Sequence, residues 1–418
     1  MKRVALDDCF LHDKDRLKHH EALDILKTQV KPLGDHEEVS LESTLGRVLA
    51  QEIIAPNNVP LTDNAAVDGY AFNHTDYLEN DGEFEITRRI AAGATEVQTL
   101  GKNNAARIFT GAPMPENADS VAMQEDCTVD GKTVKIPTGL KEGANRRRAG
   151  EDVKAGAKLY EPGRRITPQD IAALASLGNA SVLVSKLIRV AILSTGDELV
   201  EPGNDLQRGQ VYNSNGPLLE SLLRSLPISI TRMNTLADDP HAISETMEQV
   251  AKTHDVILTT GGASRGEEDH ILTVLDAIGR RHMWQLAIKP GRPMTFGHVG
   301  DAAFIGLPGN PVAAFVCFLL YARPVILQLA GANWQNPIGY SLPSAFEIKK
   351  KKTDRREFLR GILKHENGKL VVDKFTRDGS GLITGLHQSD GLVEISEDVS
   401  SLEKGSLVHF IPYSSFGI

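Results

Sequence analysis

The stretch TTGGASRGEEDHI, residues 259–271, decides how the middle of the chain is interpreted. An apolar run, 255–258, leads into it, and a hydrophobic pattern of helical type, 271–275, follows it. Glycines at a strand end let the backbone approach a ligand, and amides at a helix start favour an anion. The acids before His270 would then hold the anion's cation. Two simpler interpretations stay open, namely a tight turn at the glycines and acids that only complement the helix dipole.

The region around this stretch alternates strands with helices. We expect strands over 189–193, 228–233, 255–258, 285–288 and 302–306, and helices over 217–226, from Pro240, over 268–278 and from Pro311, with Asp239 as an N-cap. This alternation predicts βαβ units and a doubly wound, mostly parallel α/β sheet with helices on both faces. Ligands of such sheets bind at the carboxyl ends of the strands.

The flanking regions have other patterns. We expect one amphipathic helix over 19–30 and a second over 168–177 with Thr167 as N-cap. Short alternating segments between turns predict a small β-rich unit over 57–143 and a small antiparallel barrel or sandwich after 336. The four lysines 349–352 predict a solvated edge, with phosphate binding as the alternative. The apolar run 312–322, which ends at Arg323-Pro324, predicts a buried helix too short to span a bilayer.

Composition narrows the class of protein. A chain of 418 residues is long enough for several domains, and its net charge of −9 disfavours general nucleic-acid binding. The three cysteines are scattered at 9, 127 and 317, which fits neither a disulfide framework nor metal-ligand spacing. The charged N-terminus lacks the apolar core of a signal peptide. We therefore expect a cytoplasmic protein with no membrane and no nucleic-acid partner.

Three strand ends carry unusual loops. They are Ser194-Thr195-Gly196-Asp197-Glu198 after the first strand, 259–269 after the third, and Leu307-Pro308-Gly309-Asn310-Pro311 after the last. Because the carboxyl ends of parallel strands lie along one edge, we expect these loops to converge. Carboxylates beside glycines suit Mg²⁺, which takes one or two carboxylates plus phosphate oxygens. In the turn 287–293, Lys289 and Arg292 suit an oxyanion.

Eight motifs carry a resemblance to a known family. They are Asp68-Gly69-Tyr70-Ala71, Thr110-Gly111-Ala112-Pro113, Gly150-Glu151-Asp152, Ser194–Leu199, Gly261-Gly262-Ala263-Ser264, Asp269, Lys289-Pro290-Gly291 and Leu307–Pro311. In this order, the chain resembles the MoeA/gephyrin-type molybdopterin molybdenumtransferases over essentially its whole length. It departs from the family pattern at Val67, where a methionine is usual, at Arg292, where a lysine is common, and at Ala313, where a serine is frequent.

The resemblance implies four domains and a homodimer. A linker domain would comprise 1–56 plus 144–186, an inserted β-rich domain 57–143, a molybdopterin-binding-like α/β domain 187–335, and a C-terminal β-barrel 336–418. The active cleft would be shared between subunits, so that Asp68, Thr110 and Asp152 of one chain serve a site on its partner.

The resemblance also implies a reaction and residue roles. The chain would insert molybdate into adenylylated molybdopterin with release of AMP, in an Mg²⁺-dependent reaction that forms molybdenum cofactor. The catalytic residues would be Asp68, Asp152, Glu198 and Asp269, and the metal ligands Asp197, Glu198 and Asp269. Substrate would be bound by Thr110, Thr195, Gly196, Gly261, Gly262, Ser264, Lys289, Arg292, Pro293, Pro308, Gly309, Asn310, Pro311, Arg360 and Ser380. Tungstate remains an alternative to molybdate.

Two alternative functions were weighed. A molybdopterin adenylyltransferase uses the same α/β domain, but such proteins usually consist of that domain alone; one is the expected upstream partner. A gephyrin-like scaffold is the other alternative, although those relatives carry a fused second enzyme domain and a long linker that this sequence does not show.

Overall fold

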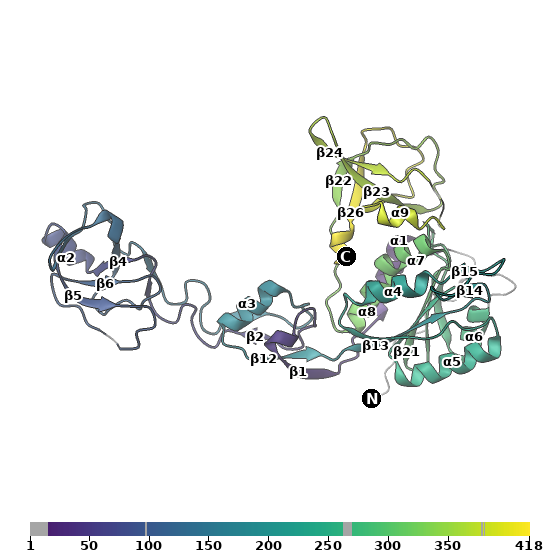
Figure 1. Cartoon of the computed structure of the whole chain (residues 1–418), viewed down its shortest axis with the longest axis horizontal. Coiled ribbons are helices and arrows are strands. Elements are labelled where there is room, and N and C mark those ends of the chain that lie inside the picture. Colours follow the sequence, from purple (N-terminus) through teal and green to yellow (C-terminus); the bar gives the residue numbers. More distant parts are fainter. Residues whose placement is uncertain (1–15, 97, 262–269, 378, 380) are drawn as a thin grey trace. The chain divides into compact units, whose positions relative to one another are not determined.

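The computed structural model describes residues 16–96, 98–261, 270–377, 379 and 381–418 (Figure 1). The chain divides into two compact units. The first unit comprises the chain up to residue 50, 162–167 and 182–418, and the second comprises 51–161 and 168–181. Each unit is described by itself.

A six-stranded α/β sheet forms the centre of the first unit. Its order is β16-β13-β17-β21-β20-β18, with β13 (Ile188–Ser194), β16 (Ile228–Arg232), β17 (Val256–Thr260), β18 (Arg280–Trp284), β20 (Thr295–Val299) and β21 (Ala302–Leu307). The strands from β16 to β21 run parallel, and β20 and β18 are antiparallel to their neighbours. The chain runs from β13 outward to β16 and then crosses to β17 on the other side of β13, so the direction of strand order reverses there.

Helices cover both faces of this sheet (Figure 1). One face is packed by α5 (Pro240–Thr253) and α6 (His270–Ile278), and the other by α4 (Asn215–Leu223), α7 (Pro311–Cys317) and α8 (Arg323–Leu329). In α5, Ile243, Met247 and Val250 are buried at the i, i+4, i+7 spacing of an amphipathic helix. The N-terminal helix α1 (His19–Gln29) adds Ala22 and Leu26 to the core on the α4 side.

The prediction of a strand over 285–288 is wrong. Strand β18 ends at Trp284, and Gln285 adopts a left-handed conformation with φ of 63°. That conformation turns the chain out of the α/β sheet, since it is incompatible with a continuing strand. The next two-residue strand, β19 (Ile288–Lys289), pairs in parallel with β23 (Arg356–Glu366) of another sheet.

The apolar helix does not end at Arg323-Pro324 as expected. It continues through the π-helical turn η3 (Phe318–Ala322) into α8 and ends at Leu329. A π turn changes the hydrogen-bonding pattern, which accommodates a proline that has no N–H to donate. The whole segment Pro311–Leu329 is long and apolar enough to cross a membrane. However, 78% of an 18-residue apolar stretch within it is buried inside the unit, as in a core helix.

The C-terminal sheet follows the order β19-β23-β25-β26-β22, and β24 pairs with β23. Its further strands are β22 (Tyr340–Pro343), β24 (Lys369–Lys374), β25 (Gly391–Ile395) and β26 (Leu407–Pro412), accompanied by α9 (Thr384–His387) and η4 (Tyr413–Phe416). A bridge between Ser344 and Val372 links the residue after β22 to β24. Val372, Val393 and Phe410 are at the centre of the core that these strands enclose.

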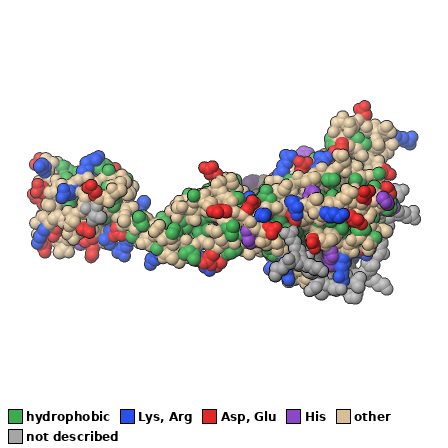
Figure 2. Space-filling view, turned by 90° about the horizontal axis from the view of Figure 1, so that it is seen from below, with side chains coloured by type: hydrophobic (Ala, Val, Ile, Leu, Met, Phe, Trp, Pro, Cys, Tyr) green, Lys and Arg blue, Asp and Glu red, His purple; other side chains and the backbone are tan. Residues whose placement is uncertain are grey.

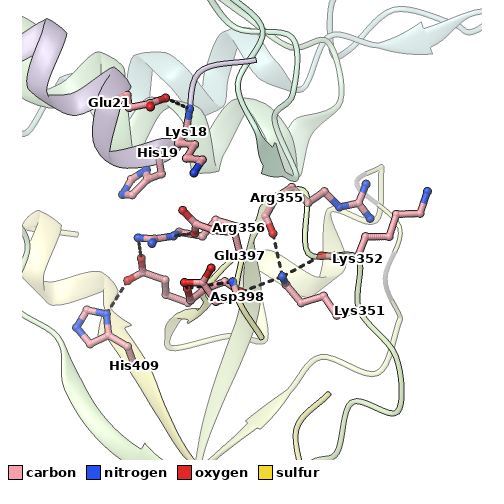
Figure 3. A network of polar contacts seen from close by, with 12 residues as sticks. Lys18, His19, Glu21, Lys351, Lys352, Arg355, Arg356, Glu397, Asp398 and His409 are labelled. Atoms are coloured by element: carbon pink, nitrogen blue, oxygen red, sulfur yellow. Dashed lines mark hydrogen bonds and ion pairs between the residues drawn. The ribbon is translucent and has the colours of Figure 1, made fainter. Parts of the chain in front are cut away.

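The four lysines before β23 are not all solvated. Lys349, Lys350 and Lys352 are exposed, but Lys351 is only 6% exposed. Its Nζ donates to three backbone oxygens, those of Lys352 at 3.0 Å, Arg355 at 2.8 Å and Ser396 at 2.9 Å (Figure 3). The predicted solvated edge is therefore wrong for Lys351, which ties the segment before β23 to the end of β25.

The second unit is built on a six-stranded sheet of order β7-β4-β6-β5-β9-β8. Its strands are β4 (Gly69–Phe72), β5 (Glu83–Ile90), β6 (Asn104–Ile108), β7 (Ser120–Met123), β8 (Thr128–Asp130) and β9 (Thr133–Lys135), with α2 (His74–Glu79) and η2 (Gln124–Asp126). Alternate residues of β4 face two separate cores, Ala71 on one side and Tyr70 and Phe72 on the other.

Short strand pairs complete the two units. In the second unit, β10 (Arg146–Arg147) pairs with β3 (Asn64–Ala65) and β11 (Lys158–Tyr160) with β2 (Ile53–Ile54), beside α3 (Pro168–Ser176). Elsewhere β1 (His36–Ser40) pairs with β12 (Ser181–Ser185) and β14 (Leu199–Val200) with β15 (Val211–Tyr212), and η1 spans Leu41–Ser43. On the face shown in Figure 2, acidic and basic side chains are interspersed.

Helix α5 provides a test of the predicted N-cap. The Asp239 carboxylate accepts from the backbone N–H of His241 and Ala242, whereas Ser214, the N-cap residue of α4, makes no such bond. We expect Asp239→Ala to destabilise the first unit by about 1 kcal/mol, because it leaves helix N–H groups unsatisfied. Both tryptophans, Trp284 and Trp334, lie in that unit, so urea unfolding followed by tryptophan fluorescence measures the loss. The control Ser214→Ala should have little effect, and equal losses for the two variants would contradict the capping role.

Candidate functional site

Two loops leave the α/β sheet side by side where its strand order reverses. Ser194 at the end of β13 is paired with Thr260 at the end of β17, so Thr195 and Gly261 begin adjacent loops. Gly261 has φ of 89°, and a Cβ there would lie 3.0 Å from the carbonyl oxygen of Thr195. Only glycine fits both the conformation and the approach. In parallel sheets this reversal is the place where ligands bind.

A third loop is held against these two by a buried amide. The Nδ2 of Asn215 donates to Thr260 Oγ1 and to the carbonyl oxygen of Gly309, each at 2.7 Å. Its Oδ1 is buried and has no hydrogen-bond partner within the described chain. Asn215 is not among the site residues predicted from the sequence, because the predicted helix begins only at Pro217. The polar run Asn213-Ser214-Asn215 was the available signal.

Carboxylates gather beside the first loop. Asp197 and Asp238 each accept a hydrogen bond from the other's backbone N–H, at 3.1 and 3.4 Å. Burial raises the pKa of Asp238 above its ordinary value, the charges of Asp197 and Glu198 raise it further, and the bond from Asp197 opposes them. The position therefore has a negative potential that a cation would offset. Sequence analysis missed Asp238, which stands in an ordinary-looking turn before α5.

The chemistry of these groups fits Mg²⁺ bound through few protein ligands. Among the described residues, no group of three or more His, Cys, Asp or Glu side chains is arranged to hold a metal. Asp197 and Glu198 match the mode in which Mg²⁺ takes one or two carboxylates and completes its shell with phosphate oxygens and water.

Four predicted site residues lie outside the described residues, and their roles stay predictions: Gly262, Ser264, Asp269 and Ser380.

A cationic cavity of about 270 Å³ lies between the turn after β19, the loop after β21, and strands β23 and β24. Among the residues that the structure describes, its lining includes no Asp or Glu. Seven lining residues are basic, namely Arg16, Lys289, Arg292, Arg355, Arg360, Lys374 and Arg377. Pro293, Pro308 and Asn310 also line it. The predicted residues of the 287–293 turn are thus in one cavity, and its composition suits an anion.

The position of Lys289 is set by a buried carboxylate. Lys289 stands opposite Glu357 in the pairing of β19 with β23, and its Nζ lies 3.8 Å from Glu357 Oε2. Arg355 Nε donates to the other oxygen of Glu357 at 3.2 Å. The Glu357 side chain is only 10% exposed, so it supplies local counter-charge to two basic residues of the wall. The sequence did not indicate this role, since the pairing joins segments about 70 residues apart.

Arg360 lines the cavity but uses its guanidinium locally. Its Nη1 donates to the carbonyl oxygen of Leu382 at 2.9 Å and its Nη2 to that of Arg377 at 2.5 Å. It also lies 4.7 Å above the Phe375 ring and is 7% exposed. Arg360 therefore positions the segment after β24 as well as contributing charge.

One short loop joins the acidic strand ends to the cationic cavity. Pro308 and Asn310 line the cavity, while the carbonyl of Gly309 between them accepts from Asn215. A Cβ on Gly309 would lie 3.6 Å from the Cα of Gly261. Pro311 then starts α7. The loop 308–310 therefore borders the cationic cavity and also lies against Gly261 at the end of β17.

The remaining predicted residues belong to the second unit. Thr110 donates from its backbone N–H and from its Oγ1 to Asp68 Oδ1, each at 2.8 Å. These two bonds lower the pKa of Asp68 and keep its exposed carboxylate charged. Asp152 lies in another stretch of the unit, where its backbone N–H donates to the carbonyl of Val59.

Comparison with known families covers almost the whole chain. Residues 17–178 match the MoeA N-terminal region (domain I and II), 191–328 a probable molybdopterin binding domain, and 342–413 the MoeA C-terminal region (domain IV). A relative from Haemophilus influenzae, named molybdopterin molybdenumtransferase, is 36% identical over 90% of this chain and 94% of its own length. A relative of the same name from Bacillus subtilis is 30% identical over 90% of each chain.

A solved structure has the same fold. The molybdopterin biosynthesis MoeA protein from Pyrococcus horikoshii superposes with a TM-score of 0.82 at 28% identity, over 96% of this chain and 100% of that one.

The cationic cavity can be tested by direct anion binding. We expect Lys289→Met to weaken binding of molybdate about tenfold or more, because a charge-assisted contact in a half-buried site contributes roughly 1.5–3 kcal/mol. Isothermal titration calorimetry measures this dissociation constant. Lys349→Met, at an exposed lysine that lies outside the cavity lining, is the matched control. Equal affinities for both variants would remove Lys289 from the anion site.

Proposed function

The chain belongs to the MoeA family of molybdopterin molybdenumtransferases, and we propose that it inserts molybdate into adenylylated molybdopterin, releasing AMP and forming molybdenum cofactor. The names of its relatives support a transferase in molybdenum cofactor biosynthesis. The observation that carries the finer proposal is the loop 308–310. It joins an acidic strand edge suited to a metal-bound pyrophosphate to a cationic cavity suited to molybdate.

Charge is the main obstacle that such a site must overcome. Molybdate is an anion, and it has to approach a pyrophosphate and a dithiolate that are also negative. Two unit charges 4 Å apart repel by about 4 kcal/mol at an effective dielectric constant of about 20. Lys289 and Arg292 would bind and orient the molybdate, and the neighbouring guanidinium groups would reduce the repulsion.

The carboxylate end has the complementary task. Asp197 and Glu198 would hold Mg²⁺, together with Asp269 as predicted from the sequence, and Asp238, which accepts from the backbone N–H of Asp197, would add negative charge beside them. When bound, the metal supplies positive charge that offsets the pyrophosphate. Thr195, Gly196, Gly261 and Gly309 would bring backbone groups against the pterin substrate. Arg360 would keep the cavity wall in place. Ser380 and the other residues predicted from the sequence would bind the substrate as well.

We further propose that the enzyme is a homodimer whose cleft is shared between subunits. Asp68, fixed by Thr110, and Asp152 would serve the site of the partner chain. The adenylylated substrate would come from a molybdopterin adenylyltransferase, and the enzyme would act in the cytoplasm. Tungstate has the same charge and shape as molybdate, so the site would accept it as well.

The metal role predicts the effect of a single carboxylate. Glu198→Gln should lower the rate of AMP release more than a hundredfold, because the amide retains the size but loses the charge that binds Mg²⁺. AMP release from adenylylated molybdopterin with molybdate is measured across a range of Mg²⁺ concentrations. Glu248→Gln, at an exposed position on the surface of α5, should behave as wild type.

Two results would contradict this assignment. Wild-type AMP release by Glu198→Gln would exclude Glu198 as a required ligand. Formation of adenylylated molybdopterin by the wild type from ATP and molybdopterin would favour the adenylyltransferase instead.

The shared cleft predicts complementation between two inactive variants. At a molybdate concentration well below the dissociation constant of Lys289→Met, Asp68→Asn and Lys289→Met should each have little activity as homodimers, since every cleft would lack one of the two residues. After subunit exchange, half of the dimers are mixed and each has one intact cleft, so about a quarter of wild-type activity should return. Mixing Glu198→Gln with Lys289→Met is the control. Each cleft takes both Glu198 and Lys289 from one chain, so every cleft of the mixed dimer still has one changed residue and no activity should return. Activity in neither mixture would contradict the shared cleft.

A further inference from the structure

A second cavity in the first unit contains an arginine pair that the proposed reaction does not use. It has a volume of about 650 Å³ and is formed by Gly163 and Arg165, the start of α8, the segment 332–338 and the turn η4. Arg165 and Arg323 both line it. It shares no lining residue with the cavity that contains Lys289.

Arg323 carries a charge without a counter-charge. Within the described part of the chain, its side chain makes no hydrogen bond or ion pair, and its Nε is buried without a partner. Burial and, to a smaller extent, the charge of Arg165 together lower the pKa of Arg323 to about 10. The guanidinium nevertheless remains protonated at neutral pH. Arg323 is partly buried, and a partly buried cation that no anion balances is destabilising, so such groups are usually paired with an anion.

Arg165 fixes the geometry of the pair. Its Nε donates to the carbonyl oxygen of Gly46 at 3.3 Å and its Nη2 to that of Ser225. Burial lowers the pKa of Arg165 as well. Among the described lining residues of this cavity none is Asp or Glu. Two guanidinium groups thus contribute to one positive potential, and one of them is already held in place.

The rest of the lining adds an apolar surface. Trp334 lines the cavity together with Pro324 and Ile338, and its Nε1 donates to Asn336 Oδ1 at 3.2 Å. The volume lies in the range of about 300–1,000 Å³ that is typical of small-molecule sites. A bare inorganic anion would fill only part of it.

We propose that this cavity binds a small molecule with a phosphate or carboxylate group and an apolar or aromatic body. Arg323 and Arg165 bind the oxyanion, for which the planar guanidinium fork is well suited. Trp334 and its apolar neighbours contact the body. The site is independent of molybdate insertion, because none of its residues takes part in the proposed reaction.

The experiment uses the full-length protein with the Lys289→Met change, so that the other anion site is weakened. Phenyl phosphate and benzoate are titrated separately by calorimetry, and phenol and inorganic phosphate report the contributions of the ring and the anion alone. We expect one of the two aromatic anions to bind more tightly than either fragment. Arg323→Gln should weaken it about tenfold or more, and Arg323→Lys less. Arg208→Gln, at an exposed arginine, is the control and should have no effect.

The outcomes distinguish small-molecule binding by the two arginines from contact with a second copy of the chain. Preference for phenyl phosphate or for benzoate identifies the anion. Undiminished binding by Arg323→Gln, or no binding of either aromatic anion by the parent protein, would overturn the proposal. A change in oligomeric state for Arg323→Gln, measured by light scattering, would also overturn it, because the arginine would then bind a second copy of the chain.

Discussion

The side-chain amide of Asn215 is the interaction on which the arrangement of the site depends. Its two N–H groups reach Thr260 at the end of β17 and the carbonyl of Gly309 after β21, so two loops are held by one side chain. Because Asn215 is 8% exposed, water cannot easily replace either bond. The loop 308–310 is thereby fixed, and with it the boundary between the carboxylates near Asp197 and the cationic cavity.

The same boundary keeps charges of opposite sign apart. Asp197, Glu198 and Asp238 lie at the strand edge, whereas Lys289 and Arg355 lie beyond the loop beside Glu357. Lys289 and Arg355 already have Glu357 as a counter-charge, and contact with these three further carboxylates would cancel the positive charge that remains in the cavity. An uncharged loop made of proline, glycine and asparagine lies between them, which the proposed binding of a metal and an oxyanion on its two sides requires. The overall charge of −9 gives no sign of this separation.

Structural features were predictable from the sequence where they follow from local chemistry or from the rules of parallel sheets. The capping role of Asp239 needs only its own turn, and the convergence of the loops after β13, β17 and β21 needs only that those strands run parallel. Prediction failed where a residue's role depends on contacts with distant segments. Gln285 redirects the chain to another sheet, Lys351 is buried by three carbonyls, and Glu357 meets Lys289 only through the pairing of β19 with β23. None of these contacts leaves a periodic pattern in the sequence.

The two basic cavities show two ways of holding positive charge without a ligand. Lys289 has Glu357 beside it, so the charge is balanced when the cavity is empty, and an incoming oxyanion must compete with a carboxylate that is already present. Among the described residues, no carboxylate pairs with Arg323 and the charge of Arg165 repels it, so an anion that enters relieves this repulsion. The first arrangement suits a substrate that must bind and then leave with each turnover. The second suits a ligand that stays bound, since loss of that ligand restores an unbalanced charge.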